Sequence, residues 1–523
     1  MFTKPWLYST KSFHKYSAQR SCQIRLKYQW KCPVGCDTGI KIYNRNVEKK
    51  VPLILSNKHF VKWYICGPTV YDSAHVGHAS SYVRFDIIRR ILENFFNVKP
   101  VIAIGVTDID DKIIKRSKQL NTDCKSLAKK YELEFFDNLK ELNVLPPAFV
   151  LRVTDHIEEI INFISVIIEK EHAYATDDGC VYFDVEKSEN YGKLIKLVNP
   201  LTSPKGNKKS SFDFALWKAC KPGEPFWESP WGKGRPGWHI ECSAMSSKVF
   251  GSTLDLHSGG LDLLFPHHEN EEAQSCSYHG CDQWVNYWFY TGLLYVEDEK
   301  MSKSLQNFIT ISDLLKSYTV DNFRMFCFIS KYNTELQYKT GSMEHAVGEY
   351  NKILRFLADS KSYINGNWNL GNISEPILLE ALQKTSKNVT KNLANDFDTG
   401  ACFSDIMELV SLAMHMLHDQ RLTNIRSPGT IAAVSQYVEG LLHSFGFQLG
   451  SSFSQQNDYA REEFIISSAV NFRNEVRANA LSCNDTSVKQ NLLKASDSFR
   501  NDLKSVGITV KDQGKNVSAW GNM

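Results

Sequence analysis

The stretch from Cys66 to His78 constrains the fold of this 523-residue chain most strongly, because it joins a predicted buried strand to a predicted helix. Residues 61–65 before it are apolar apart from one lysine, a pattern typical of a strand buried on both faces. Residues 83–95 after it place their apolar side chains on one side of a helix. A strand, a glycine-containing loop and a helix start attract phosphate through backbone N–H groups and the helix dipole. The stretch therefore predicts a phosphate-binding turn in an α/β domain.

Three side chains of this turn suggest chemistry. His75 and His78 are three residues apart, so both can face one bound anion. Cys66 ends the strand, where it can be a metal ligand or a nucleophile. Taken alone, the turn is equally consistent with a buried thiol and two surface histidines, because short motifs are only hypotheses.

The order of the other predicted elements indicates a parallel α/β domain that carries an insertion. A second buried strand at 98–106 follows the first helix, and strand, helix and strand at this spacing predict a right-handed parallel unit. Residues 184–236 lack periodicity and are rich in Lys, Pro, Gly and Trp, which predicts an insertion between the halves of the domain. From about residue 345 to the end the apolar period is helical, which predicts a bundle. Further elements are predicted as helices at 125–142 and 154–171, a hairpin at 174–183 turned by Asp178-Gly179, and a strand within 288–296.

One short motif in the insertion is misleading. Residues Gly232 to Gly237 match the dinucleotide-binding pattern G-x-G-x-x-G letter for letter. The motif follows Ser229-Pro230-Trp231 instead of an apolar strand, and Pro236 lies inside it, so the context of a nicotinamide-binding turn is missing. We therefore predict a loop there.

Composition excludes several classes of protein. A hydrophobic content of 42% and a charged content of 23% are typical of a soluble globular chain of two to four domains. No apolar run approaches the roughly 18 residues of a membrane helix, so no membrane partner is expected. The net charge of +3 by itself implies no partner. The 13 cysteines are odd in number and scattered, which favours reduced thiols over a disulfide framework.

The charge at the N-terminus is uneven. Residues 1–36 contain seven lysines and arginines, interspersed with serines, and no acidic residue. The segment has no continuous apolar core of a secretory signal. This composition predicts a mitochondrial transit peptide, with a disordered basic tail as the alternative.

Three later segments contain side chains that can work together with the first turn. His267 and Glu271 are four residues apart, so they share one face of a helix that begins after Pro266. With Cys66 and Cys242 they form a set of two sulfurs, one nitrogen and one oxygen that suits zinc. Each residue alone is better explained as a core cysteine or a capping histidine, but the four together favour a metal site. Because the paired knuckles of structural zinc sites are missing, we expect the fold to assemble the site inside a cleft.

The third segment, Lys300-Met301-Ser302-Lys303-Ser304, offers two cations and two hydroxyls on a predicted loop. Such a loop can stabilise the negative charge of a leaving pyrophosphate. As a bare charged loop it is also consistent with a solvated surface turn.

Together these motifs resemble those of the cysteinyl-tRNA synthetases, a family of class I aminoacyl-tRNA synthetases. Residues 75–78, His-Val-Gly-His, are similar to the family's HIGH motif, and residues 300–304 match its KMSKS motif. The resemblance runs from about Cys66 to Trp520. Two departures are Ser80, where many members have arginine, and Gln306, where glycine is usual.

The resemblance implies roles for individual residues. The zinc ligands would be Cys66, Cys242, His267 and Glu271. The pocket for the substrate cysteine would include Gly67, Thr69, Thr107, Trp238 and His257. Catalytic residues would be His75, His78, Lys300 and Lys303, and ATP would be bound by His75, His78, Asp262 and Lys303.

The fold that the resemblance implies is α/β, with a Rossmann-like parallel-sheet catalytic domain, a connective insertion and an α-helical anticodon-binding bundle. On this basis we divide the chain into a transit peptide at 1–36, a first catalytic half at 50–150, the insertion at 151–235, a second catalytic half at 236–344 with the KMSKS loop, and the anticodon-binding domain at 345–523.

The implied activity is that of a cysteine–tRNA ligase. ATP, bound with Mg²⁺, activates L-cysteine to cysteinyl adenylate, and the cysteinyl group passes to the 3′ end of tRNA-Cys. The expected protein is a monomer in the mitochondrial matrix. Lys112 and Lys115 resemble residues that some members use, with pyridoxal phosphate, to make cysteine persulfide. Alternatives are a related cysteine-adenylating ligase acting on an amino sugar and a catalytically silent RNA-binding homologue.

Overall fold

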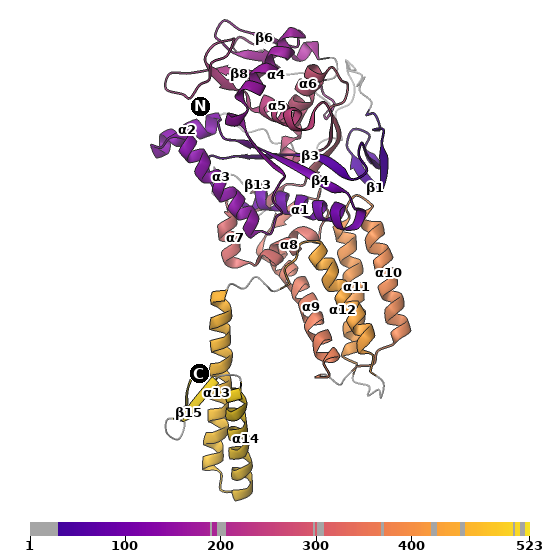
Figure 1. Cartoon of the computed structure of the whole chain (residues 1–523), viewed down its shortest axis with the longest axis vertical. Coiled ribbons are helices and arrows are strands. Elements are labelled where there is room, and N and C mark those ends of the chain that lie inside the picture. The colour runs from indigo at the N-terminus through magenta and orange to yellow at the C-terminus, as the bar shows by residue number, and fades with distance from the viewer. Residues whose placement is uncertain are drawn as a thin grey trace, which may run out of the picture. The chain divides into compact units, whose positions relative to one another are not determined.

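The computed structural model describes residues 30–188, 191–195, 206–296, 299–300, 308–367, 371–419, 426–449, 455–505, 508–512 and 518–522 (Figure 1). Internal contacts divide the chain into two compact units, Met1–Phe447 and Gln448–Met523. Every predicted site residue that the structure describes lies in the first unit.

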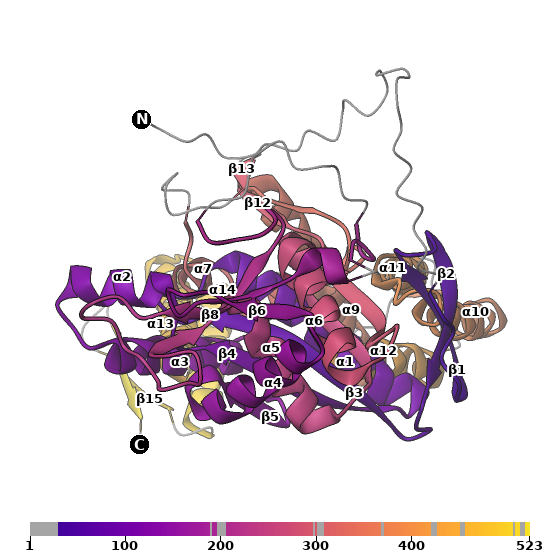
Figure 2. The ribbon, with the colours of Figure 1, turned by 90° about the horizontal axis from the view of Figure 1, so that it is seen from above.

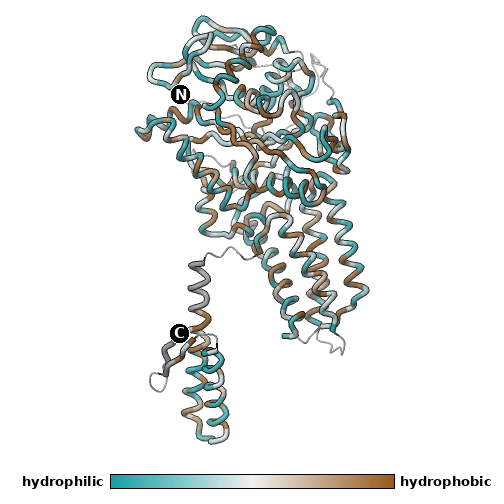
Figure 3. The backbone as a smooth tube through the Cα atoms, viewed as in Figure 1, coloured by the Kyte–Doolittle hydropathy of each residue, from teal (hydrophilic) through white to brown (hydrophobic). Residues whose placement is uncertain are grey.

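The core of the first unit is a five-stranded parallel sheet in the order β11-β10-β3-β4-β5. Hydrophobic segments follow these strands in Figure 3, and their apolar side chains are mostly buried. The chain moves from β3 outward to β5 on one side and then to β10 and β11 on the other. The order therefore reverses between β3 and β10, where ligands bind in open α/β sheets. The strands are β3 Phe60–Thr69, β4 Lys99–Thr107, β5 Phe149–Arg152, β10 Leu254–Gly260 and β11 Val285–Thr291.

Helices connect these strands as the parallel arrangement requires. Helix α1 (Val76–Phe96) joins β3 to β4, so the first predicted unit is confirmed. Helices α2 (Asp111–Leu120) and α3 (Cys124–Glu141) join β4 to β5, and α5 (Trp238–Phe250) leads into β10. Helix α6 (Glu269–His279) joins β10 to β11.

The insertion has its own antiparallel sheet in the order β6-β7-β8-β9. The predicted hairpin is formed by β6 and β7, with Gly179 at φ 80° in the turn.

Two details of the insertion differ from expectation. Leu151 and Arg152 pair in the central sheet, so the insertion begins after β5. Gly234–Pro236 is an edge strand and not part of a loop, because Gly234 lacks the Cβ that would lie 2.3 Å from Trp217 Nε1. The elements are α4 Ile157–Glu169, β6 Ala173–Ala175, β7 Val181–Phe183, β8 Phe214–Ala219 and β9 Gly234–Pro236.

A small sheet in the order β13-β12-β14 follows the central one. The strand predicted within 288–296 is split at Gly292, where a Cβ would lie 2.2 Å from the Thr334 carbonyl oxygen. Lys300 lies in β13, whereas Lys303 lies outside the described residues. The elements are β12 Leu294–Val296, β13 Glu299–Lys300, β14 Leu336–Tyr338, α7 Ile311–Ser317 and α8 Val320–Phe328.

The predicted bundle begins with α9 and ends the first unit with α12. Among the described residues, one helix, α11, is long and apolar enough to cross a membrane. It packs against α9, α10 and α12, so its apolar side chains contribute to the core of the bundle. The helices are α9 Thr340–Ile364, α10 Glu375–Leu393, α11 Thr399–Leu417 and α12 Pro428–Ser444.

A hairpin that the sequence analysis did not foresee precedes the central sheet. Strands β1 (Cys36–Asn44) and β2 (Lys49–Leu55) pair antiparallel. The backbone N–H of Lys41 donates to Ala394 at 2.7 Å, which attaches this hairpin to the segment between α10 and α11 (Figure 2).

The second unit contains two helices, α13 (Gln455–Ser482) and α14 (Thr486–Ser505). The hairpin β15–β16 follows them, at Ile508–Asp512 and Ser518–Asn522. The expectation of helix up to the C-terminus was therefore wrong for these last strands.

Candidate active site

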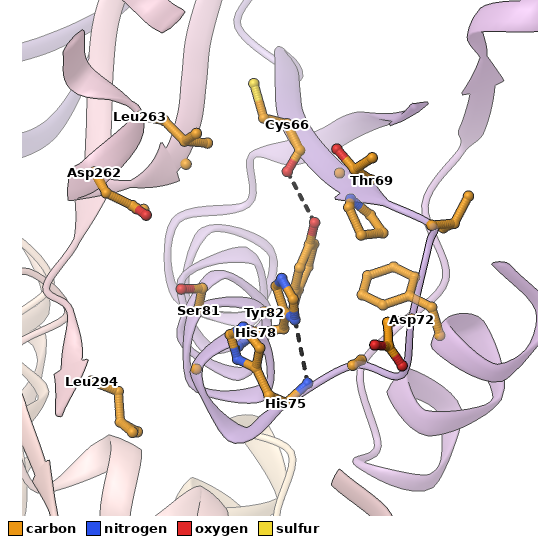
Figure 4. Close-up of a pocket in the computed structure, with 18 of the residues that line it drawn as sticks. Cys66, Thr69, Asp72, His75, His78, Ser81, Tyr82, Asp262, Leu263 and Leu294 are labelled. Atoms are coloured by element: carbon orange, nitrogen blue, oxygen red, sulfur yellow. Dashed lines mark hydrogen bonds between the residues drawn. The ribbon is translucent and has the colours of Figure 1, made fainter. Parts of the chain in front are cut away.

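A cavity of about 610 Å³ opens at the carboxyl ends of β3 and β10, where the strand order reverses (Figure 4). Its position agrees with the rule for open α/β sheets. Expected site residues on its wall are Cys66, Gly67, Thr69, His75, His78, Trp238 and Asp262. Residues from both halves of the catalytic domain therefore meet in one cavity.

The two histidines of the first turn cap α1 reciprocally. Nδ1 of His75 accepts a hydrogen bond from the backbone N–H of His78, and Nδ1 of His78 accepts one from His75, both at 3.3 Å. Their rings are stacked with centroids 3.8 Å apart. A neutral imidazole whose Nδ1 accepts carries its proton on Nε2. Each ring therefore presents an Nε2–H donor, as a site for phosphate requires.

The segment that follows the KMSKS motif is attached to this histidine turn. The N–H of Val76 donates to the Ile309 carbonyl at 3.0 Å, and the N–H of Ile311 donates to Ala74 at 3.2 Å. The ring of Phe308 meets His75 edge-on, with centroids 5.4 Å apart. These contacts place residues 308–311, which follow the motif in the sequence, beside His75.

The four expected zinc ligands converge although they come from three distant segments. Cys66 lies on β3, Cys242 on α5, His267 immediately before α6, and Glu271 on α6. All four ligand atoms lie within 4.8 Å of one another. Cys66 Sγ is 3.9 Å from Cys242 Sγ, Cys242 Sγ is 3.6 Å from His267 Nε2, and His267 Nε2 is 2.9 Å from Glu271 Oε1. A tetrahedral zinc with Zn–S bonds of about 2.3 Å needs its sulfurs about 3.8 Å apart, so the donor set fits zinc.

The electrostatics of these buried side chains reflect their mutual contacts. Burial and its neighbours raise the pKa of the Cys66 thiol, whereas the hydrogen bond from Cys66 lowers the pKa of Cys242 to about 6. Burial alone would lower the pKa of His267, but Glu271 and Cys242 raise it to about 10. Burial would also raise the pKa of Glu271, but His257 and His267 hold it well below its ordinary value. Anionic sulfur and oxygen are thus gathered in a place without water, where a cation would offset the cost of burying them.

A second group of possible ligands overlaps the first. It consists of Cys66, His257, His268 and Glu271. This group offers one sulfur in place of two. His257 Nε2 lies 2.7 Å from Glu271 Oε2, and His268 Nδ1 lies 3.1 Å from the Tyr290 hydroxyl. The first group therefore suits zinc better, and these two histidines orient the ligands from outside, as groups around metal sites do.

The residues expected to contact substrate cysteine divide into two sets. Gly67, Thr69 and Trp238 lie on the cavity wall, and the Trp238 ring stacks on His267 with centroids 4.3 Å apart. Thr107 and His257 do not belong to this wall. Thr107 donates to Glu241 Oε2 at 2.8 Å, and His257 is completely buried against Glu271. Thr107 thus contacts α5, and His257 contacts α6.

Asp262 lies on the cavity wall just after β10, in the turn Leu261–Leu263. A Cβ on Gly260 would lie 2.6 Å from Asp262 Oδ1, so glycine leaves room for this carboxylate. The position suits the expected contact with ribose.

Sequence reasoning missed several residues around the site. Tyr82, one turn of α1 after His78, donates through its hydroxyl to the Cys66 carbonyl at 2.9 Å. His239 Nδ1 lies 2.9 Å from His267 Nδ1, and His268 lies 3.4 Å from Cys66 Sγ. The i, i+4 spacing of Tyr82 and His78 and the adjacent His267-His268 pair were the available signals.

Comparisons with known proteins agree with this geometry. Residues 53–348 match a family model described as "tRNA synthetases class I (C) catalytic domain". The chain is 43% identical over 525 residues to the "Probable cysteine--tRNA ligase, mitochondrial" of Xenopus tropicalis, covering 94% of this chain and 91% of that protein. It is 40% identical over 488 residues to the "Cysteine--tRNA ligase" of Methanococcus maripaludis strain C7, covering 91% and 98%.

Solved structures agree at the level of the fold. A Mycobacterium tuberculosis methionyl-tRNA synthetase in complex with methionyl-adenylate has a TM-score of 0.55 at 14% identity, covering 73% of this chain and 91% of that chain. An Agrobacterium radiobacter K84 LeuRS, solved as a ternary complex with tRNA and LeuAMS, has a TM-score of 0.56 at 10% identity, covering 75% and 84%. The predicted fold class is confirmed.

Proposed function

Because the chain belongs to the cysteine–tRNA ligases of the class I aminoacyl-tRNA synthetases, we propose that it charges tRNA-Cys in mitochondria and selects cysteine through zinc. The family expected from the motifs is confirmed, and the ligase activity follows from it. The zinc, the compartment and the roles of single residues belong to the proposal.

One observation supports the proposal most strongly. Cys66 is both a member of the four-ligand cluster and part of the cavity wall that contains His75 and His78. A substrate whose thiol reaches the cluster would therefore place its remaining atoms in the cavity of the phosphate-binding turn. Activation of cysteine by ATP requires this proximity.

The chain's residues act in the first step by position and charge. The carboxylate of cysteine attacks the α-phosphate, and pyrophosphate leaves. A general base is unnecessary, because the nucleophile is already ionised. His75 and His78 donate Nε2–H groups to phosphate oxygens, Asp262 accepts from the ribose hydroxyls, and Lys300 and Lys303 stabilise the leaving pyrophosphate with Mg²⁺. In the second step the terminal ribose hydroxyl of tRNA-Cys takes the cysteinyl group.

Selection against serine depends on the metal ligands. Cysteine and serine differ by one atom, and an apolar pocket separates such near-isosteres only about 10–200-fold. Zinc held by Cys66, Cys242, His267 and Glu271 would bind the substrate sulfur as thiolate, which serine cannot supply. Glu271 is the weakest donor to zinc in this set, so we assign it as the ligand that yields when the substrate sulfur arrives.

Import into the mitochondrial matrix is supported by two observations. The relative in Xenopus tropicalis carries "mitochondrial" in its name. The first 29 residues, which lie outside the described residues, are basic, rich in serine and free of acidic residues. A reporter fused to this segment should enter mitochondria, and a cytosolic reporter would contradict the assignment.

A side activity with pyridoxal phosphate stays a prediction from the family resemblance. Lys112 lies on the cavity wall, with Nζ 5.6 Å from the centroid of the Tyr71 ring. Mass spectrometry of products formed from cysteine and pyridoxal phosphate tests for cysteine persulfide directly.

The activity itself is tested by cysteine-dependent exchange of pyrophosphate into ATP. Exchange should occur without tRNA, require cysteine and be negligible with serine. Charging of a tRNA-Cys transcript should follow in the same preparation. Exchange without charging, with transfer to an amino sugar, would favour the related ligase. The absence of exchange would favour an RNA-binding homologue.

A further inference from the structure

A lysine, a carboxylate and two thiols meet at the C-terminal end of α6, beyond the residues of the active site. Cys276 Sγ lies 3.2 Å from Lys193 Nζ, 3.4 Å from Glu272 Oε1 and 4.0 Å from Cys281 Sγ. The side chain of Lys193 is only 3% exposed, whereas both cysteines are partly exposed. Both cysteines are thus only partly covered by the fold, and a buried cation contacts the sulfur of Cys276.

The backbone brings the two cysteines together. Helix α6 ends at Gly280, whose φ of 68° is left-handed. The N–H groups of Gly280 and Cys281 both donate to the Cys276 carbonyl, at 2.9 and 3.2 Å. This turn folds Cys281 back over Cys276. A disulfide needs its sulfurs about 2.05 Å apart, so closure must bring these two sulfurs together from their present 4.0 Å.

We propose that Cys276 and Cys281 are a redox-active dithiol that hydrogen peroxide closes to a disulfide, and that closure detaches Cys276 from Lys193. The thiolate of Cys281 attacks one peroxide oxygen, so an S–O bond forms, the O–O bond breaks and hydroxide leaves. The sulfur of Cys276 then attacks the sulfur of Cys281, so the S–S bond forms and the S–O bond breaks. The proton of Cys276 leaves with oxygen as water. Two thiols are oxidised, and the peroxide is reduced to water.

The order of the two thiols follows from their surroundings. The contact between the two sulfurs is the largest cause that holds the pKa of Cys281 below its ordinary value. The same contact, together with burial, raises the pKa of Cys276. Cys281 is therefore the attacking residue, and Cys276 resolves the sulfenic acid.

Closure would affect a contact between the insertion and α6. Lys193 belongs to a short segment whose backbone N–H groups, at Gly192, Lys193 and Leu194, donate to the Glu269 carboxylate at 2.8, 3.0 and 2.7 Å. Lys193 Nζ adds a contact to Glu272 at 3.2 Å. Because Cys276 must turn toward Cys281 to form the disulfide, Lys193 loses one of its partners, and the segment is held less tightly on α6. This inference does not depend on the proposed function.

The test treats the full, zinc-loaded chain with limiting hydrogen peroxide and maps its thiols by alkylation and mass spectrometry. The peptide containing Cys276 and Cys281 should lose two hydrogen atoms and resist alkylation until dithiothreitol is added. Cys281→Ser should abolish the product. Cys276→Ser should leave Cys281 as a trapped sulfenic acid. Cys124→Ser is the matched control, because Cys124 is also partly exposed but contacts the hydroxyl of Ser117 at 3.1 Å.

Three results would overturn the proposal. The first is that Cys276 and Cys281 stay alkylatable at a dose that oxidises Cys124. The second is a covalent link between the side chains of Lys193 and Cys276 through one oxygen atom, found in place of the disulfide between Cys276 and Cys281. The third is unchanged hydrogen exchange at the amides of Gly192 to Leu194. The proposal expects this exchange to rise about 10-fold in the oxidised protein, because the contact to Glu269 weakens. Unchanged exchange after disulfide formation would disprove the coupling to Lys193.

Discussion

Cys66 shows how one side chain connects two parts of the site. Its sulfur belongs to the four-ligand cluster, its backbone carbonyl accepts from Tyr82 of the histidine helix, and its thiol lies on the cavity wall. The end of β3 thus connects the four-residue cluster to the turn that contains His75 and His78. A residue of this kind cannot be replaced without moving both.

Gly260 provides a test at the level of a single residue. Gly260→Ala adds a Cβ that would lie 2.6 Å from Asp262 Oδ1, so the carboxylate must leave its present position. If Asp262 binds ribose, losing a hydrogen bond to a charged group raises the KM for ATP about 10-fold, with the KM for cysteine unchanged. Steady-state pyrophosphate exchange measures both constants. Gly341→Ala is the control, because nothing lies within 4 Å of its Cβ, and equal effects of the two variants would contradict the role of Asp262.

At the level of elements, Arg84 connects α1 to the sheet that contains Lys300. Its side chain donates to the carbonyls of Gly292, Tyr332 and Thr334, each at 3.0 Å. The histidine turn at the start of α1 and the strands around the KMSKS motif are thereby held in a defined relation. Arg84 lies one helical turn after Ser80. Ser80 is the residue that stands where many members of the family have arginine.

Replacement of Arg84 tests this connection. Arg84→Met removes one donor from each of these three carbonyls, although the Tyr332 carbonyl still accepts from the Gly292 N–H at 3.1 Å. A buried carbonyl left unsatisfied costs about 1–3 kcal/mol. We expect a lower melting temperature and a higher KM for ATP, while zinc content stays at one per chain. Arg84→Lys should restore part of both effects. A variant with wild-type stability and kinetics would show that the connection is unimportant.

A second connection joins α2 to the insertion and depends on pH. Asp111 accepts from Lys218 at 2.7 Å and from Arg235. Partial burial would raise the pKa of Asp111, but these two cations hold it below its ordinary value. The ionised carboxylate therefore stabilises the fold above about pH 3.9, and this contribution is lost as the pH falls through the lowered pKa.

Asp111→Asn should accordingly lower the stability at pH 7 by less than about 1 kcal/mol, because the side chain is largely exposed. The difference from the unchanged protein should shrink as the pH is lowered from 5 toward 3. Thermal unfolding at several pH values measures it. A difference that grows in acid would contradict the assigned ion pairs.

The sequence predicted the elements whose signal is local. The apolar run at 61–65, the helical stripe after His78 and the Asp178-Gly179 turn all became the expected elements. The meeting of Cys66, Cys242, His267 and Glu271 was also predicted, because the pattern of residue types was unusual enough to recognise. The hairpin β1–β2 was not foreseen, and its attachment to Ala394, more than 300 residues away, has no local signal in the sequence. The positions of Thr107 and His257 were missed because the direction of a side chain at a strand end depends on the helix packed against it.

At the level of the whole molecule, the N-terminal boundary of the folded protein differs from the expected transit peptide. Trp30 donates to the Asn286 carbonyl at 2.9 Å and its ring packs on Tyr287. Lys31 contacts Asp282 at 2.7 Å, and β1 begins at Cys36. Residues 30–36 thus belong to the catalytic domain, so we expect import processing to cut before Trp30.

Two truncations test this boundary. A chain that begins at residue 30 should match the full chain in melting temperature, whereas one that begins at residue 37 should lose about 1–3 kcal/mol through the half-buried aromatic contact and the hydrogen bond of Trp30. Mass spectrometry of the mature protein from mitochondria identifies the natural end. A mature N-terminus beyond Lys31 would contradict the prediction.

The central claim is that the metal cluster and the substrate cavity are one site. Zinc K-edge spectroscopy of the purified protein, recorded with and without cysteine, tests it most directly. We expect a shell of two sulfurs, one nitrogen and one oxygen in the free protein and one additional sulfur when cysteine is bound, with serine causing no change. Cys242→Ser should lose zinc and cysteine affinity together while ATP binding largely survives. A zinc shell that is identical with and without cysteine would show that the metal is structural and would contradict the account of selectivity.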